Sequence, residues 1–493
     1  MILRLDAGVN RYYVQTLAMI FFPGAKFSLD EQVTPDTPIV TVNTADTSVG
    51  FTAKVTITIG EISVTAQDTV GKQDKQPMRI KPDKRAIGAA FLKAGEMFFK
   101  YTPSWGILTG VRPAKFAIDL IEEGKSETEI RKILTKQYLM TPKKATLLIS
   151  VAENEIQMLK ATPKRSCSVY ISIPFCPTRC NYCSFVSYST QRLKNLIPDY
   201  LEQLKKDIDI TFKKIKEANL TVSTVYIGGG TPSILNEVQI SDLIECINKN
   251  ISVRELAEFT FEAGRPDTIT REKLEVMKQG GVTRVCINPQ TLNDSVLEII
   301  GRSHTAEDFY KAYELARTSG IKCINTDIIA GLTGESFASF SRTVDGIISL
   351  KPENITIHTF SAKRAAEITQ NDKTVYSRST SVVGKSVDYG QLEAKNAGYL
   401  PYYIYRQKNQ VGNLENVGYA LPGYEGLYNM YMMEETQSIF SIGAGAVSKM
   451  VGEDGTTIRR ASYPKYPYEY LNDEKHDKAQ NEIFAQINEC YFK

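Results

Sequence analysis

From residue 168 to about residue 360, short strands rich in β-branched residues alternate with longer amphipathic helices. The six predicted strands are 168–173, 222–227, 258–262, 284–288, 323–329 and 355–360. The predicted helices lie at about 198–218, 239–248, 271–279, 294–301, 306–319 and 336–350. Such repeats form a parallel sheet with crossover helices. We therefore expect an α/β fold, a partial (β/α)6-type barrel whose functional residues follow the carboxyl ends of the strands.

The segments on either side of these repeats have different patterns. Residues 1–160 hold a helix capped by Asn10, an alternating strand over 51–59 and three later helices, which predicts an α+β domain with a helical connector. Residues 165–380 hold the barrel. Residues 381–493 are rich in Tyr and Gly and have few periodic segments, so we expect a smaller C-terminal module on the barrel mouth.

Charge and hydropathy exclude several functional classes. The 493 residues carry 59 Lys and Arg against 56 Asp and Glu, a net charge of +3, which argues against a nucleic-acid or membrane-surface binder. No apolar run approaches the roughly 18 residues of a membrane span. The apolar stretch 17–22 lacks the cleavage site of a signal peptide. We expect a cytoplasmic monomer with no nucleic-acid or membrane partner.

Three of the eight cysteines are clustered in one loop after the first predicted strand: Cys176, Cys180 and Cys183. Three thiolates can hold three corners of an iron–sulfur cube and leave one iron open, or fill three positions of a tetrahedral zinc site. No second cysteine pair is present, which favours a [4Fe-4S] cluster over zinc. The other five cysteines are scattered among apolar residues, as buried thiols in a reducing compartment are.

The spacing C-x3-C-x2-C, with Tyr182 before the third cysteine, resembles the signature of the radical SAM superfamily. The stretch from Tyr170 through Pro-Phe-Cys176 is similar to the coproporphyrinogen dehydrogenase branch, and the whole chain to its HemZ-type subgroup. The resemblance implies a radical SAM barrel with a HemN-like C-terminal module. It also implies that the open iron binds S-adenosyl-L-methionine, whose reductive cleavage yields a 5′-deoxyadenosyl radical.

The same resemblance suggests residues that hold the first cofactor. Gly229, Gly230 and Thr231 match the glycine motif for the methionine amino group, although a tight turn explains these residues equally well. Glu262 matches an acidic residue that contacts the adenosine part. Tyr170 matches an aromatic near the cofactor, and so does Tyr182 of the cysteine loop; core packing is the alternative for both.

A second set of polar residues follows later strands and helices. Gln290, Arg302 and Asp327 are expected to face the same mouth, where the resemblance implies a second S-adenosyl-L-methionine or nearby substrate. A buried polar network at the rim is the alternative, because Asp327 needs a partner if it is buried. Ser361 and Val447 are assigned to the same cofactor set. The predicted catalytic residues are Tyr170, Arg302 and Asp327.

Cations and aromatic rings in the C-terminal segment suit a flat polycarboxylate such as a tetrapyrrole, although a solvated face is the alternative. The residues are Tyr402, Tyr403, Tyr405, Arg406, Lys408, Asn409 and Asn413. His358 follows the sixth strand, either as a core residue or in contact with a ligand. Better-known family members carry histidine at the position of Ser172, which puts the substrate pocket in doubt.

The resemblance implies oxygen-independent oxidative decarboxylation of coproporphyrinogen III to protoporphyrinogen IX, with an unidentified electron donor and acceptor. Two rivals use the same barrel: a heme-binding chaperone, and a radical methyltransferase or heme-degrading enzyme. The weakest alternative is an interaction protein in which the three cysteines hold a structural zinc ion.

Overall fold

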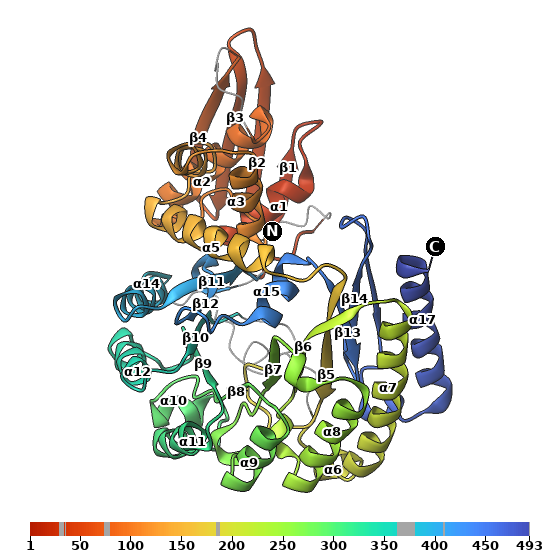
Figure 1. The fold of residues 1–493 in the computed structure, drawn as a ribbon. Helices are drawn as coiled ribbons and strands as arrows, with labels where there is room; N and C mark the ends of the chain where they lie inside the picture. The colour runs from red at the N-terminus through yellow and green to blue at the C-terminus, as the bar shows by residue number, and fades with distance from the viewer. Residues whose placement is uncertain are drawn as a thin grey trace.

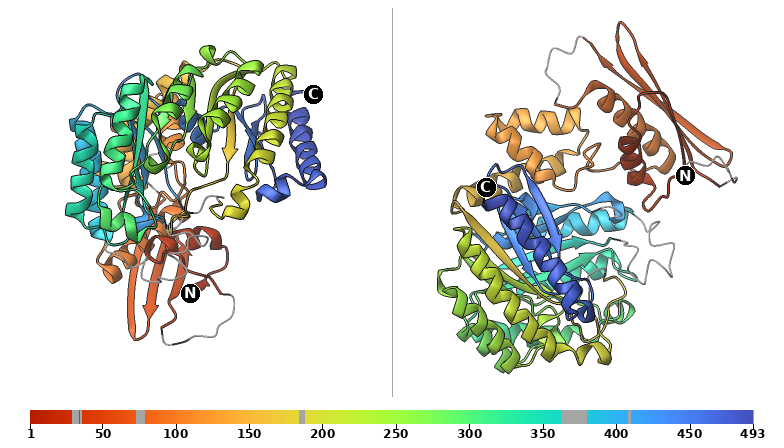
Figure 2. Two further views of the ribbon diagram at one scale, coloured as in Figure 1. Left: turned by 90° about the horizontal axis from the view of Figure 1, so that it is seen from below. Right: turned by 90° about the vertical axis from the view of Figure 1, so that its right-hand side faces the viewer.

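The computed structural model describes residues 1–28, 34, 36–72, 79–183, 188–361, 380–407 and 410–492. Its strands form two sheets, a four-stranded sheet near the N-terminus and an eleven-stranded sheet in the main body (Figure 1). Figure 2 shows the smaller sheet projecting from one end of the molecule, with connector helices between it and the larger sheet.

The N-terminal part is a sheet covered by two helices, β1 (Ile2–Leu5), α1 (Arg11–Phe21), β2 (Ile39–Asp46), β3 (Gly50–Ile59), β4 (Ile62–Gly71) and α2 (Pro82–Phe99). The strand order is β1-β2-β3-β4. Asn10 caps α1 as predicted, because its side chain accepts a hydrogen bond of 2.9 Å from the Tyr13 amide. Helix α2 begins at Pro82, where proline suits the first helical turn.

The connector consists of α3 (Pro113–Glu122), α4 (Glu127–Lys132), η1 (Ile133–Gln137) and α5 (Pro142–Lys160). Its buried residues, such as Leu120 and Leu148, share one continuous hydrophobic core with the barrel. The sheet and helices before it have a separate core that includes Phe21 and Phe91. The connector therefore packs as part of the main body.

The predicted barrel repeats are present in the structure. The parallel strands are β5 (Ser166–Ile173), β6 (Thr221–Gly229), β7 (Glu258–Phe261), β8 (Arg284–Cys286), β9 (Cys323–Ala330) and β10 (Asn354–Thr359). The crossover helices are α7 (Ile197–Glu217), α8 (Glu237–Asn250), α9 (Arg271–Gln279), α10 (Asp294–Ile299), α11 (Ala306–Ser319) and α12 (Phe337–Ser349), on the outside of the curved sheet (Figure 1). Short helices α6 (Gln191–Lys194), η2 (Pro232–Ile234), η3 (Val253–Glu255) and η4 (Pro266–Thr268) complete this part.

The C-terminal segment is more regular than its weakly periodic sequence suggests. Its elements are α14 (Thr380–Asn396), β11 (Leu400–Tyr405), η6 (Val411–Asn413), β12 (Asn416–Ala420), α15 (Leu427–Glu434), β13 (Ser438–Ile442), β14 (Val447–Val451), β15 (Ile458–Ser462), α16 (Pro467–Tyr470) and α17 (Asp473–Tyr491). Strands of five or six residues between turns are too short to produce a clear period.

These late strands extend the barrel sheet at both edges, giving the order β11-β12-β10-β9-β8-β7-β6-β5-β13-β14-β15. Strand β12 runs antiparallel to β10, and β13 runs parallel to β5. The segment is thus part of the barrel wall as well as a cover for its mouth, and its HemN-like character stays a prediction. Within the described parts of the chain, no helix is both long and apolar enough to cross a bilayer.

Candidate active site

A cavity of about 360 Å³ opens inside the barrel, within the size range of small-molecule sites. All six parallel strands or the loops after them contribute to its lining. Most of the residues assigned from the sequence lie around it: Cys176, Cys180, Tyr182, Cys183, Gly229, Gly230, Thr231, Glu262, Gln290, Arg302, Asp327 and Ser361. The structure therefore brings the cysteine loop and the second polar set to one cavity.

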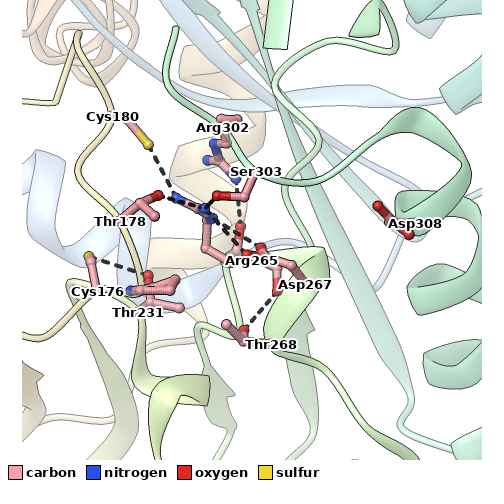
Figure 3. A network of polar contacts seen from close by, with 12 residues as sticks. Cys176, Thr178, Cys180, Thr231, Arg265, Asp267, Thr268, Arg302, Ser303 and Asp308 are labelled. Atoms are coloured by element: carbon pink, nitrogen blue, oxygen red, sulfur yellow. Dashed lines mark hydrogen bonds and ion pairs between the residues drawn. The ribbon is translucent and has the colours of Figure 1, made fainter. Parts of the chain in front are cut away.

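The cysteine loop follows β5, and hydrogen bonds within its own backbone hold its shape. The Cys176 amide donates to the carbonyl of Tyr188 at 3.0 Å, and the Cys183 amide to that of Cys180 at 3.1 Å. Two of the sulfurs also accept hydrogen bonds (Figure 3): Cys176 Sγ from the Thr231 hydroxyl at 3.3 Å, and Cys180 Sγ from Arg265 Nη1 at 3.5 Å. Both hydrogen bonds hold these sulfurs in place on the cavity wall.

The three cysteines fit an iron–sulfur cube. All three line the wall of one cavity, and none is in a disulfide. Among the described residues, no three His, Cys, Asp or Glu side chains lie close enough together to hold a single metal ion. A cube takes its thiolates at separate corners, so it accepts ligands that are spread along a cavity wall.

The glycine segment at the end of β6 packs against the cysteine loop. A Cβ on Gly230 would lie 2.6 Å from the Phe175 carbonyl oxygen, and Gly229 has a φ of +115° that side chains rarely adopt. The Gly230 amide donates to the Ile173 carbonyl at 2.9 Å, and the Thr231 amide to the Phe175 carbonyl at 2.8 Å. The backbone therefore already satisfies both of these amides.

Glu262 follows β7 and faces the cavity next to the glycine segment. Burial and the nearby charge of Asp327 raise the pKa of the Glu262 carboxyl to about 8, against the opposing effect of the Gly229 amide. Gly228 leaves room for this side chain, because a Cβ there would lie 2.6 Å from Glu262 Oε2. A buried carboxyl on the cavity wall can accept hydrogen bonds from the hydroxyl groups of a bound ligand.

Arg302 joins the cysteine loop to the second polar set. Its Nη2 donates to the Tyr182 hydroxyl at 3.2 Å, and its Nη1 to the carbonyls of Gly264 and Asn288 at 3.2 and 3.1 Å. Gln290 lies between strands in the left-handed region, with φ 67°, and its amide donates to the Asp327 carbonyl at 3.1 Å. Gln290 and Asp327 are thus fixed by the backbone, and both line the cavity.

Asp327 is the centre of a polar cluster on β9 and β10. Burial alone would raise the pKa of this carboxyl, but hydrogen bonds from His358, Asn325 and Thr356 and the charge of His358 lower its pKa overall. His358 Nδ1 lies 3.3 Å from the Tyr405 hydroxyl. The cluster therefore offers an ionised carboxylate with a histidine and a phenol beside it.

Tyr170 and Val447 are not among the cavity-lining residues. Tyr170 stacks on Tyr226 and Tyr428 at ring-centroid distances of 6.0 and 6.1 Å, so it reaches the cavity only through Tyr226, a lining residue. Val447 begins β14, where it is 50% exposed. Ser172 is buried and donates to the Ala444 carbonyl at 3.0 Å.

Arg406 and Asn413 do not face the cavity, so their assignment to substrate carboxylates was wrong. Arg406 is buried and donates to the Asn413 side chain at 2.6 Å. Its guanidinium also lies over the ring of Trp105, and this contact joins the segment before α3 to the end of β11. Tyr402 is also buried, whereas Tyr403 and Tyr405 line the cavity. Lys408 and Asn409 lie outside the described residues.

Six residues that line the cavity were not foreseen from the sequence: Arg265, Arg284, Asn288, Asn325, Thr356 and Tyr226. Two of them follow strands directly, Arg265 after β7 and Asn288 after β8. The rule that functional residues follow barrel strands could have found these two. The others face inward from within strands, which alternation alone does not reveal.

Comparisons with known proteins agree with this site. The profile of the Radical SAM superfamily matches residues 170–347. The oxygen-independent coproporphyrinogen-III oxidase-like protein HemZ of Bacillus subtilis is 38% identical over 408 residues, covering 80% of this chain and 81% of that protein. The heme chaperone HemW of the same organism is 35% identical over 192 residues, covering 39% of this chain and 49% of that protein.

A solved structure shares the fold. The coproporphyrinogen III oxidase HemN from Escherichia coli, described as a radical SAM enzyme, has a TM-score of 0.50 and 21% identity, and the match covers 64% of this chain and 71% of that one. By its extended similarity to HemZ, the chain belongs to the radical SAM superfamily, in the group of oxygen-independent coproporphyrinogen-III oxidase-like proteins.

Proposed function

We propose that the protein catalyses oxygen-independent oxidative decarboxylation of coproporphyrinogen III to protoporphyrinogen IX. The observation that carries this proposal is the shared cavity, where three cysteines at one part of the wall face a polar set of Gln290, Arg302 and Asp327. A reaction that removes hydrogen from an unactivated carbon needs both a radical source and groups that hold the substrate beside it.

The reaction is balanced for each of two propionate side chains. One C–H bond at the β-carbon and the bond to the carboxylate break, a C=C bond forms, and one hydrogen atom, one carbon dioxide molecule and one electron leave. The hydrogen atom would pass to the 5′ carbon of S-adenosyl-L-methionine, whose bond to sulfur would break with one electron from the external reductant and release methionine. The electron lost by the substrate would pass to a one-electron acceptor. A [4Fe-4S] cluster with S-adenosyl-L-methionine supplies the one-electron chemistry that removes this hydrogen.

The residues of the chain would divide the remaining work. Cys176, Cys180 and Cys183 would hold the cluster, and Glu262 would accept hydrogen bonds from the adenosine part. Gln290, Arg302 and Asp327 would position a second S-adenosyl-L-methionine or the substrate. Ser361 lines the same cavity and would complete the cofactor wall.

A heme chaperone is the second candidate, because relatives named heme chaperone HemW match part of the chain, one of them at 35% identity over 192 residues. A chaperone would bind heme in place of a porphyrinogen and release it unchanged. The two candidates therefore differ in whether the tetrapyrrole is altered.

The test is an anaerobic incubation of the reconstituted full-length protein with coproporphyrinogen III, S-adenosyl-L-methionine and a reductant, analysed by mass spectrometry. The proposal predicts a product that has lost carbon dioxide and two hydrogens from each of two propionates. A parallel spectroscopic titration with heme separates the candidates: tight heme binding without any porphyrinogen product would favour the chaperone and overturn the proposal.

A further inference from the structure

Arg265 is a buried cation beside the cysteine loop that the proposed reaction does not use. It follows β7 and is only 3% exposed. Its Nη1 donates to Cys180 Sγ at 3.5 Å, and its Nη2 to the hydroxyls of Thr178 at 3.0 Å and Ser303 at 3.5 Å (Figure 3). Asp267 pairs with it, with Arg265 Nε and Asp267 Oδ1 at 3.1 Å.

We propose that Arg265 sets the reduction potential of the cluster through its hydrogen bond to Cys180. This inference rests on the assignment of Cys176, Cys180 and Cys183 to a [4Fe-4S] cluster. Arg265 is a positioning residue in this proposal, because it acts through a cluster ligand.

The direction of the effect follows from charge. Hydrogen bonds to cluster sulfurs and the net charge nearby set the potential of such clusters. A guanidinium stays protonated in proteins, and reduction adds one negative charge to the cluster. Arg265 therefore stabilises the reduced form more than the oxidised form. At Cys176 the corresponding donor is the neutral hydroxyl of Thr231, which has a weaker effect.

Asp267 opposes this effect while it keeps the guanidinium in place. Its two carboxylate oxygens lie 3.1 and 3.4 Å from Arg265 Nε and Nη2, and its side chain is 25% exposed. The carboxylate cancels part of the positive charge near Cys180. Removing Asp267 and removing Arg265 should therefore shift the potential in opposite directions, which a general loss of structure would not do.

The experiment is an anaerobic redox titration of the full-length reconstituted protein, followed by electron paramagnetic resonance, with iron content measured on each sample. Arg265→Gln should lower the ratio of reduced to oxidised cluster about tenfold at the wild-type midpoint, equivalent to about 59 mV for a one-electron couple. Asp267→Asn should raise that ratio. Arg265→Lys keeps the charge and should lie between wild type and Arg265→Gln.

Arg254→Gln is the matched control, because Arg254 is exposed on η3, and it should leave the potential unchanged. A wild-type midpoint for Arg265→Gln at full iron content would overturn the inference. If the Arg265→Gln protein holds less iron, the potential of the Asp267→Asn protein becomes the test. An unshifted or lowered potential in Asp267→Asn would then overturn the inference. Failure of the cluster assignment gives a different result, since the wild-type protein would then bind no iron–sulfur cluster.

Discussion

His358 Nε2 lies 3.8 Å from Asp327 Oδ2, across neighbouring parallel strands β10 and β9 on the cavity wall. This contact and the hydrogen bonds to Asp327 lower the pKa of the carboxyl despite its burial. The pair puts a negative charge and a histidine on the same wall as Gln290.

The first prediction concerns Asp327. Asp327→Asn removes the charge but keeps the shape, so product formation from coproporphyrinogen III should fall at least about tenfold, the loss expected for a charge-assisted hydrogen bond. Cleavage of S-adenosyl-L-methionine without substrate should continue. Both rates are measured by liquid chromatography. The control is Asp345→Asn, because Asp345 is an exposed carboxylate on α12. An equal loss of product formation and of S-adenosyl-L-methionine cleavage in Asp327→Asn would contradict a role in holding the substrate.

The second prediction concerns Glu262. Glu262→Gln should weaken binding of S-adenosyl-L-methionine about 2- to 10-fold, because a hydrogen bond between neutral groups contributes about 0.5–1.5 kcal/mol. Equilibrium dialysis of the reconstituted protein measures this. Glu275→Gln on the exposed side of α9 should bind normally. Unchanged affinity in Glu262→Gln would show that the carboxyl does not contact this cofactor.

The third prediction concerns the joint between connector and barrel. Lys144 Nζ lies 2.5 Å from Glu415 Oε1, and both side chains are at most 3% exposed. Lys144→Met leaves Glu415 buried without its cation and should lower the free energy of unfolding by about 3–5 kcal/mol.

Trp105 reports on this joint. It is the single tryptophan of the chain, and its indole nitrogen donates to Glu415 at 2.6 Å. Urea unfolding followed by tryptophan fluorescence therefore measures the loss. The control is Lys143→Met, because Lys143 and Asp388 are 55% and 40% exposed and such a pair contributes at most about 1 kcal/mol. Equal effects of the two variants would refute the prediction.

The fourth prediction is a pH dependence of stability from two buried carboxyls, Glu155 on α5 and Glu434 on α15. Burial and the neighbouring Glu434 raise the pKa of Glu155 well above its usual value, and burial raises the pKa of Glu434 to about 7. Arg112 and Lys115 oppose the shift of Glu434, whereas Asp119 and Glu435 add to it.

Because the folded state holds these protons more tightly than the unfolded state, stability is highest near the unfolded pKa of about 4.3 and falls as pH rises towards the folded pKa values. Glu155→Gln should reduce the loss of stability between pH 5 and pH 8, roughly 1–3 kcal/mol, since one pKa unit is worth about 1.4 kcal/mol. Urea unfolding at several pH values measures it. The exposed Glu153→Gln should keep the wild-type slope; an identical slope in Glu155→Gln would contradict the account.

Much of the barrel could be predicted because its signals are local. Strands β5 to β10 are β-branched runs bounded by turns, and the cysteine loop is fixed by its position after β5. Arg406 was misassigned because an Arg next to tyrosines has the same sequence whether it binds a ligand or Trp105, about 300 residues away in the chain. The direction in which the Val447 side chain points depends on the register of β14, which is set by pairing with Ser462 on β15. Such long-range pairings leave no local pattern.

The most direct test of the proposed function follows one hydrogen atom. Coproporphyrinogen III deuterated at the β-carbons of its propionates is incubated anaerobically with the reconstituted protein, S-adenosyl-L-methionine and a reductant, and the 5′-deoxyadenosine is analysed by mass spectrometry. The account predicts one deuterium in the 5′-deoxyadenosine formed with each vinyl group, and no 5′-deoxyadenosine from Cys176→Ala, whereas Cys246→Ala behaves as wild type. 5′-Deoxyadenosine without deuterium, beside unchanged coproporphyrinogen III, would contradict the central claim.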